Sequence, residues 1–148
     1  MLPTELSTEA RIRVIFGDTD QMGVVYHANY LRFFEASRAE FLRARGTTYR
    51  QMERDGLIIP IVEAHCHYRA PARYEDLLVV KCTVDEVRRA SVAFVYEIRR
   101  EGEEQVLTTG RTVHACINES GRPVRLPAAM VELLGGLAPA PGRTSSNS

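Results

Sequence analysis

The sequence predicts an α+β fold in which one long helix packs against an antiparallel sheet. Only one long segment has helical periodicity, and the β-rich segments that follow it are joined by short turns. The alternation of strands and helices that builds a parallel doubly wound sheet is absent. At 148 residues, of which 45% are hydrophobic, the chain is long enough to form one core without disulfides or a structural metal.

The N-terminal third predicts one strand, one loop and the long helix. Residues Arg11 to Phe16 alternate polar and apolar side chains, which is typical of a half-buried strand. Glycines and aspartates over residues 17–23 then predict a loop. The segment Tyr30 to Arg45 has no Gly or Pro, and its apolar side chains recur at helical spacing. We expect Asn29 to cap the start of this helix and Gly46 to end it.

The rest of the chain predicts most of the sheet. The expected elements are a short helical turn over Thr47–Asp55, an extended segment over Leu57–Arg69, antiparallel strands over Leu77–Val87 and Ser91–Arg100, a strand over Val106–Asn118 and a helix over Pro127–Leu134. We therefore expect one domain over residues 1–134 and a disordered tail over residues 135–148, which are rich in Gly, Pro and Ser. Because free sheet edges commonly pair with a second copy, we expect at least a dimer.

Composition excludes several classes of partner. The 19 basic and 19 acidic side chains give a net charge of zero, which argues against binding to nucleic acid or to an anionic membrane. No stretch approaches the roughly 18 apolar residues of a membrane span, and the first nine residues do not resemble a signal peptide. The three cysteines form no CxxC motif, which is consistent with free thiols in a reducing compartment. We expect a soluble cytoplasmic protein.

Common catalytic and nucleotide-binding motifs are absent from the sequence, including GxSxG, GxGxxG, the P-loop and HExxH. His65 and His67 would share one face of a strand with Glu63, and these residue types suit zinc. A strand that alternates solvent-facing polar residues with buried Val62, Ala64 and Cys66 would give the same string, and no further ligands cluster nearby. We therefore predict no metal site.

Residues 16–30, FGDTDQMGVVYHANY, are hard to explain by folding alone. A helix N-terminus carries unpaired N–H groups and a partial positive charge, which would stabilise a developing oxyanion. A carboxylate beside it could attack a carbonyl or activate water, and acyl transfer needs both features. Asp18 and Asp20 could equally be residues that form or cap a turn. The spacing leaves both interpretations open.

The string GDTDQMGVVYHANYLRFFEASR, the YRAPAR turn over residues 68–73 and the EVRRAS corner over residues 86–91 resemble one family. They are similar to the hotdog-fold acyl-CoA thioesterases of the 4-hydroxybenzoyl-CoA thioesterase family, in the YbgC-like branch. The resemblance covers about Arg11 to Leu134. It implies a long central helix wrapped by a curved antiparallel sheet, with the sheets paired across a homodimer and two dimers forming a tetramer. The implied substrate is an acyl-CoA, and no separate cofactor is implied.

The resemblance also implies roles for particular residues. Asp20 would be the catalytic nucleophile or general base, and the backbone amide of His27 would polarise the thioester carbonyl. The His27 imidazole would add a donor or position water, or would simply cap the helix. Asp18 would support the loop. Another branch of the fold places its carboxylate on the central helix, where this chain has Glu35, but that branch lacks the Asp-x-Asp loop.

The coenzyme and the reaction class are implied more loosely. Arg88, Arg89 and Arg122 would contact the phosphates of coenzyme A, because guanidinium groups bind such oxygens in pairs. The alternatives to thioester hydrolysis are a hotdog dehydratase or hydratase and a non-catalytic acyl-CoA-binding protein. The sequence leaves the acyl group open, and also whether a carrier-protein thioester could serve.

Overall fold

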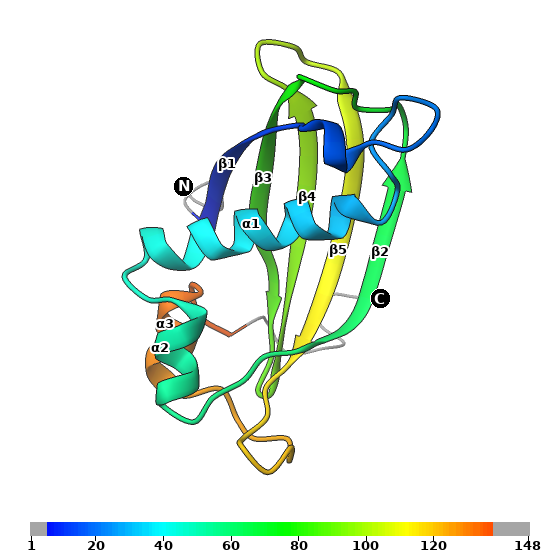
Figure 1. Cartoon of the computed structure of the whole chain (residues 1–148). Helices are drawn as coiled ribbons and strands as arrows, with labels where there is room; N and C mark the ends of the chain where they lie inside the picture. Colours follow the sequence, from blue (N-terminus) through cyan, green and yellow to red (C-terminus); the bar gives the residue numbers. More distant parts are fainter. Residues whose placement is uncertain (1–5, 138–148) are drawn as a thin grey trace, which may run out of the picture.

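The structure is a computed structural model that describes residues 6–137, and in it one long helix crosses a five-stranded sheet (Figure 1). The strands are β1 (Ser7–Arg13), β2 (Ile61–Tyr68), β3 (Leu77–Val87), β4 (Ser91–Arg100) and β5 (Val106–Ala115). Their order across the sheet is β1-β3-β4-β5-β2, and every neighbouring pair is antiparallel. The predicted α+β architecture is confirmed.

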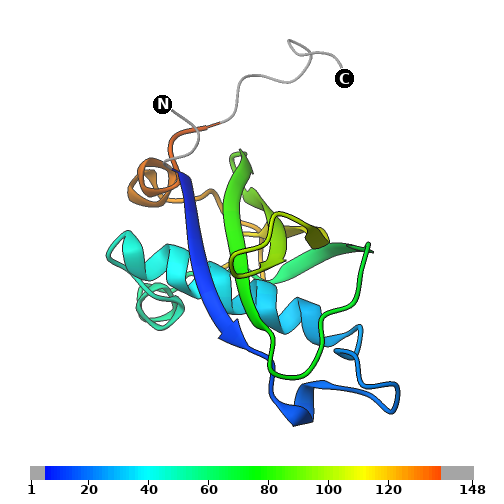
Figure 2. The same cartoon turned by 90° about the horizontal axis from the view of Figure 1, so that it is seen from above.

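Helix α1 (Asn29–Ala44) packs one aromatic face against the sheet and crosses β1 and β3 (Figure 2). Phe33, Phe34 and Phe41 are fully buried, as their helical spacing predicts. Gly46, with φ at 87°, follows the helix end and confirms the predicted stop. The predicted Asn29 cap is wrong, because its side chain donates to the Asp18 carbonyl oxygen (2.8 Å) instead of capping α1.

Strand β1 begins and ends earlier than the sequence predicts. It pairs with β3 from Ser7 opposite Thr83 to Arg13 opposite Leu77, and Leu77 is the first residue of β3. The chain after Arg13 therefore has no strand beside it, and a 3₁₀ turn follows over Phe16–Asp18. Val14 is buried as expected, but the Phe16 side chain is 76% exposed.

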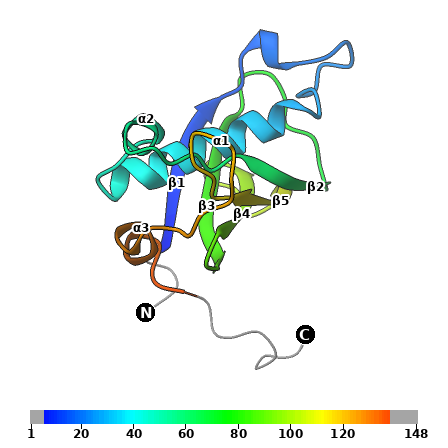
Figure 3. The same ribbon diagram turned by 90° about the horizontal axis from the view of Figure 1, so that it is seen from below.

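Two short helices complete the described chain. Helix α2 (Tyr49–Arg54) is capped by the Thr48 hydroxyl, which accepts a hydrogen bond from the Gln51 amide (3.0 Å). Helix α3 (Ala128–Leu133) lies beside the start of β1 (Figure 3), as the predicted terminal helix. The predicted tail lies outside the described residues from residue 138 onward. Within residues 6–137, no helix is long and apolar enough to cross a membrane.

A chain of buried polar groups joins α1 to the sheet. The guanidinium of Arg38 donates to the Tyr96 hydroxyl (3.0 Å), which lies 2.6 Å from Oγ1 of Thr112. Thr112 Oγ1 lies 2.9 Å from Nε2 of His114, and Nδ1 of His114 lies 3.0 Å from the Ile59 carbonyl oxygen. Because a carbonyl only accepts, Nδ1 carries the proton, and a neutral His114 accepts from Thr112 through Nε2.

Acid is expected to destabilise the fold through His114. Its burial, and then the positive charge of Arg38, lower its pKa from 6.5 to about 4. Between these values the unfolded chain binds a proton that the folded chain does not, so the free energy of unfolding falls as the pH falls. The loss is expected to reach about 3 kcal/mol near pH 4. Urea denaturation of wild type and His114→Gln, carried out above pH 6.5 and near pH 4, measures this loss of unfolding free energy. An equal loss in the two proteins would contradict this origin.

Candidate active site

Asp18 organises the loop that precedes α1. Its side chain is only 5% exposed, its Oδ2 accepts the Ile15 amide (3.0 Å), and its Oδ1 pairs with the Arg32 guanidinium. The Asp18 carbonyl oxygen accepts from the Tyr26 amide (2.9 Å) and from the side chain of Asn29 (2.8 Å). Asp18 therefore ties both ends of the loop together, which agrees with the supporting role expected for it.

Asp20 forms a turn with one carboxylate oxygen and keeps the other free. Its Oδ1 accepts the amides of Met22 (2.8 Å) and Val24 (3.4 Å), and Gly23 reverses the chain with φ at 79°. Within residues 6–137, no donor forms a hydrogen bond with Oδ2. The turn-forming interpretation is thus correct for Oδ1, and it leaves Oδ2 able to react or to accept a proton.

A pocket of about 300 Å³ brings this carboxylate to the start of α1. Three segments meet here at one end of the sheet: the loop, the first residues of α1 and the turn after β2 (Figure 1). The loop and the turn are joined by the Val25 amide, which donates to the Ala72 carbonyl oxygen (2.8 Å). The lining residues are Asp20, Val24, Val25, His27, Tyr30, Tyr68, Arg69, Ala70 and Pro71.

The start of α1 has two unpaired amide donors, and one of them belongs to the lining residue His27. The amides on either side are used, since Tyr26 donates to Asp18 and Asn29 donates to the Tyr26 carbonyl oxygen, each at 2.9 Å. The N–H groups of His27 and Ala28 donate to no acceptor in the described part of the chain. Together with the partial positive charge of a helix N-terminus, they can stabilise a negative oxygen. The exposed His27 ring packs against Tyr26, with 4.4 Å between ring centroids.

The arginines predicted to bind coenzyme phosphates lie at the other end of the protomer. Arg88 and Arg89 follow the last residue of β3, and the 11 residues of that strand span about 35 Å. The Arg89 carbonyl oxygen accepts the Leu126 amide (2.7 Å), so the segment that carries Arg122 lies at this same end. Within one protomer these arginines do not meet the Asp20 pocket. Glu35 is exposed and does not line that pocket.

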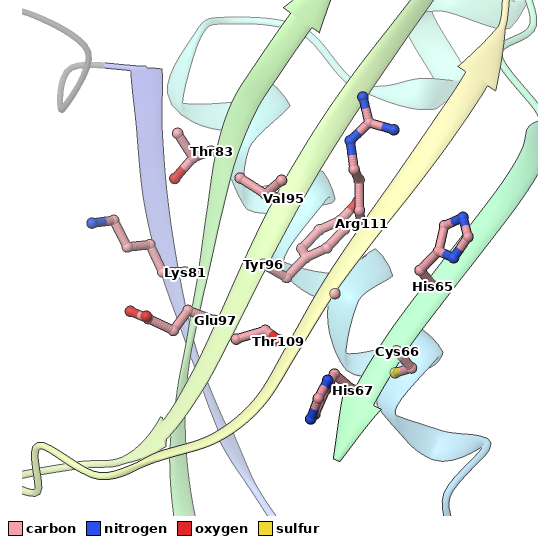
Figure 4. Close-up of a pocket in the computed structure, with 11 residues that line it drawn as sticks. His65, Cys66, His67, Lys81, Thr83, Val95, Tyr96, Glu97, Thr109 and Arg111 are labelled. Carbon is pink, nitrogen blue, oxygen red and sulfur yellow. The ribbon is translucent and has the colours of Figure 1, made fainter. Parts of the chain in front are cut away.

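His65 and His67 line a larger hollow of about 660 Å³ on the sheet face opposite α1 (Figure 4). His65 lies 3.7 Å from the Glu63 carboxylate. Within residues 6–137, no three His, Cys, Asp or Glu side chains are close enough to hold a metal ion. The expected alternation of exposed and buried residues is wrong for β2, because Val62 is 57% exposed. β2 is an edge strand of the sheet, and its residues are exposed apart from the half-buried Cys66.

The sequence predicted no role for Tyr68, although this residue opens the YRAPAR turn that carries part of the family resemblance. It lines the Asp20 pocket from the last position of β2, and its hydroxyl donates to the His27 carbonyl oxygen (2.9 Å). The only local signal was a tyrosine at a strand end, just before the turn that contains Pro71.

The chain is similar to known proteins in both sequence and fold. Residues 14–134 match the thioesterase-like superfamily. The chain is 35% identical to the acyl-CoA thioesterase YbgC of Haemophilus influenzae, over 78% of this chain and 85% of that protein. The crystal structure of a 1,4-dihydroxy-2-naphthoyl-CoA thioesterase from Synechocystis superposes with a TM-score of 0.81 at 25% identity, over 86% of this chain and 95% of the other. The crystal structure of a hypothetical protein from Aquifex aeolicus also superposes with a TM-score of 0.81. Its sequence is 34% identical, and the match covers 85% of this chain and 98% of the other.

Proposed function

The chain belongs to the thioesterase-like superfamily of hotdog-fold proteins, and from this we propose that it hydrolyses an acyl-CoA thioester to a free acid and coenzyme A. One observation carries the proposal. Asp20, which has a free carboxylate oxygen, and His27, which has an unpaired amide, line one pocket next to the start of α1. The similarity to acyl-CoA thioesterases of other organisms supports the choice of substrate.

In this proposal the thioester carbonyl docks with its oxygen on the His27 amide. Asp20 either attacks the carbonyl carbon, to give an anhydride that water then cleaves, or removes a proton from the water that attacks. Both routes expel coenzyme A as a thiolate, which is a good leaving group and needs no strong acid. One oxyanion donor is typically worth about 3 kcal/mol, so the start of α1 contributes as much as the carboxylate does.

A homodimer formed through β2 completes the proposal. β2 is a sheet edge whose residues are exposed apart from the half-buried Cys66, and they include the apolar Ile61 and Val62. An unpaired, apolar edge is a template for another strand. Pairing two copies of β2 in antiparallel fashion joins the sheets and covers this edge.

The same pairing explains how Arg88 and Arg89 could reach the coenzyme. Ile61 lies opposite His114 in β5, and Ser91 lies opposite Ala115, so the start of β2 is at the sheet end that carries these arginines. A twofold axis through the middle of β2 places the start of one β2 beside the end of the other. The partner subunit's Arg88, Arg89 and Arg122 then lie at the same end as the Asp20 pocket, where they can bind phosphates.

A charge on the β2 edge should therefore separate the subunits. Val62→Lys places an ammonium group on this edge and is expected to convert the dimer to a monomer with little thioesterase activity. Glu9→Lys puts the same charge on β1, the opposite edge, and should leave the dimer intact. Sedimentation velocity with both variants measures the outcome. A monomeric wild type, or equal behaviour of the two variants, would contradict pairing through β2.

Release of free thiol from a panel of acyl-CoAs tests the proposed reaction. The panel should contain short aliphatic, long-chain and aromatic acyl groups, and one acyl carrier-protein thioester. We expect stoichiometric release of acid and thiol from at least one member. Water addition to an enoyl thioester without thiol release would instead indicate a hydratase. Tight binding of every member without turnover would indicate an acyl-CoA-binding protein.

A further inference from the structure

The last residue of β2 contacts the backbone at the start of α1. The Tyr68 hydroxyl donates to the His27 carbonyl oxygen over 2.9 Å, and the two residues are 41 positions apart in the sequence. We propose that Tyr68 is a positioning residue for the reaction, which holds the His27–Ala28 peptide and thereby keeps the first turn of α1, with the unpaired amides of His27 and Ala28, in the orientation that faces the substrate. This inference rests on the function proposed above.

The peptides on both sides of His27 are held by different partners. The preceding peptide is fixed because the Tyr26 carbonyl oxygen accepts the Asn29 amide (2.9 Å). The following peptide contains the His27 carbonyl. This carbonyl oxygen accepts a long hydrogen bond of 3.4 Å from the Tyr30 amide. The hydrogen bond from the Tyr68 hydroxyl is therefore the shorter of the two that this carbonyl oxygen accepts. Without it, the first turn of α1 would keep only the weaker bond at the point where the substrate oxygen must dock.

The Tyr68 ring is itself held in place by its neighbours. Its centroid lies 5.2 Å from that of Tyr30 and 6.4 Å from that of His27, and both contacts are edge to face. Burial, with smaller contributions from Cys66, raises the pKa of Tyr68 to about 12. The hydroxyl is thus protonated near neutral pH and can donate. The hydroxyl donates to the His27 carbonyl oxygen (2.9 Å), and the Cys66 thiol is a second neighbour of this hydroxyl.

This arrangement assigns two separate tasks to two side chains of one pocket. Asp20 supplies the charge that attacks or takes a proton, whereas Tyr68 never touches the reacting atoms. Loss of the Tyr68 hydroxyl should therefore lower kcat and leave KM nearly unchanged, because the pocket walls stay in place. We expect a loss of about tenfold, which is a fraction of the 10²–10³-fold that removal of a whole oxyanion donor costs.

Tyr68→Phe tests this, because it removes the hydroxyl and keeps the ring. The matched control is Tyr74→Phe, since Tyr74 is also about half exposed and its hydroxyl forms no hydrogen bond within residues 6–137. Steady-state thiol release, thermal unfolding and the ¹H–¹⁵N resonance of the His27 amide are measured for each. The expected result is a kcat loss and a moved His27 resonance for Tyr68→Phe alone, with the unfolding temperature and KM preserved.

Three results would overturn the inference. Tyr68→Phe could keep the wild-type kcat, Tyr74→Phe could lose as much, or the loss could appear in KM together with a lower unfolding temperature. Asp20→Asn is assayed in parallel to separate the two levels of the proposal. If wild type turns over and Asp20→Asn does not, the Tyr68→Phe result decides this inference alone. Thiol release that survives Asp20→Asn would overturn the proposed function, and this inference with it.

Discussion

Replacement of Asp20 by Asn should lower kcat for thiol release by about 10³-fold, within the 10²–10⁴-fold range of a positioned acid or base. The substituted amide keeps an oxygen that can accept from the Met22 and Val24 amides, so the turn is preserved. The charge and basicity of Oδ2 are lost, and with them attack or proton removal. KM and the unfolding temperature should stay close to wild type. Steady-state kinetics and thermal unfolding measure both parts.

Asp18→Ala is the matched control, because it removes a carboxylate from the same loop. Asp18 is buried and does not line the pocket, and its loss leaves the Ile15 amide without an acceptor. We expect a loss of about 2 kcal/mol in the free energy of unfolding, and a smaller loss of kcat than for Asp20→Asn. The assignment of roles fails if Asp20→Asn turns over normally, or if Asp18→Ala loses kcat to the same extent without losing stability.

Gly110→Ala is expected to cause the largest loss of stability. A Cβ atom at Gly110 would lie 2.3 and 2.4 Å from two ring carbons of Phe34 and 3.0 Å from the His65 carbonyl oxygen. The Phe34 ring stacks on Tyr96, with centroids 4.3 Å apart and planes 10° apart, so it has no free space to move into. Overpacking of this kind costs about 3 kcal/mol. Urea denaturation measures the change in the free energy of unfolding.

Gly17→Ala controls for the general effect of replacing a glycine. No heavy atom lies within 4 Å of a Cβ built at Gly17. The free energy of unfolding of Gly17→Ala should therefore differ from that of wild type by no more than about 0.5 kcal/mol. Equal stabilities of the two variants would contradict the close contact between α1 and β5.

Local patterns predicted most of the fold. The aromatic spacing of Phe33, Phe34 and Phe41 identified α1, and β-rich runs around short turns identified β3 and β4 with their observed bounds. The bounds of β1 were wrong because they depend on where β3 begins, which no local pattern contains. The predicted burial of Val62 was wrong for a similar reason, since the place of β2 at the sheet edge depends on its pairing with the distant strand β5.

The candidate site also has residues that one local segment identifies and residues that depend on distant parts of the chain. Asp20 and His27 lie in one loop and were selected by the family resemblance, since spacing alone left the role of the aspartates open, and the pocket contains both residues. Tyr68 was missed because its contact with His27 joins positions 41 residues apart. Arg88 and Arg89 lie far from the pocket within one protomer, and only the proposed dimer relates them to it, which no local pattern in the sequence describes.

In the proposed reaction, the amide at the start of α1 binds the acyl oxygen beside Asp20. Saturating ¹⁵N-labelled Asp20→Asn with an acyl-CoA that the wild type cleaves, and recording its ¹H–¹⁵N spectrum, tests this most directly. We expect a downfield shift of the His27 amide proton as the thioester oxygen accepts its hydrogen bond. A saturated complex in which the His27 and Ala28 amide resonances stay at their free positions would contradict it.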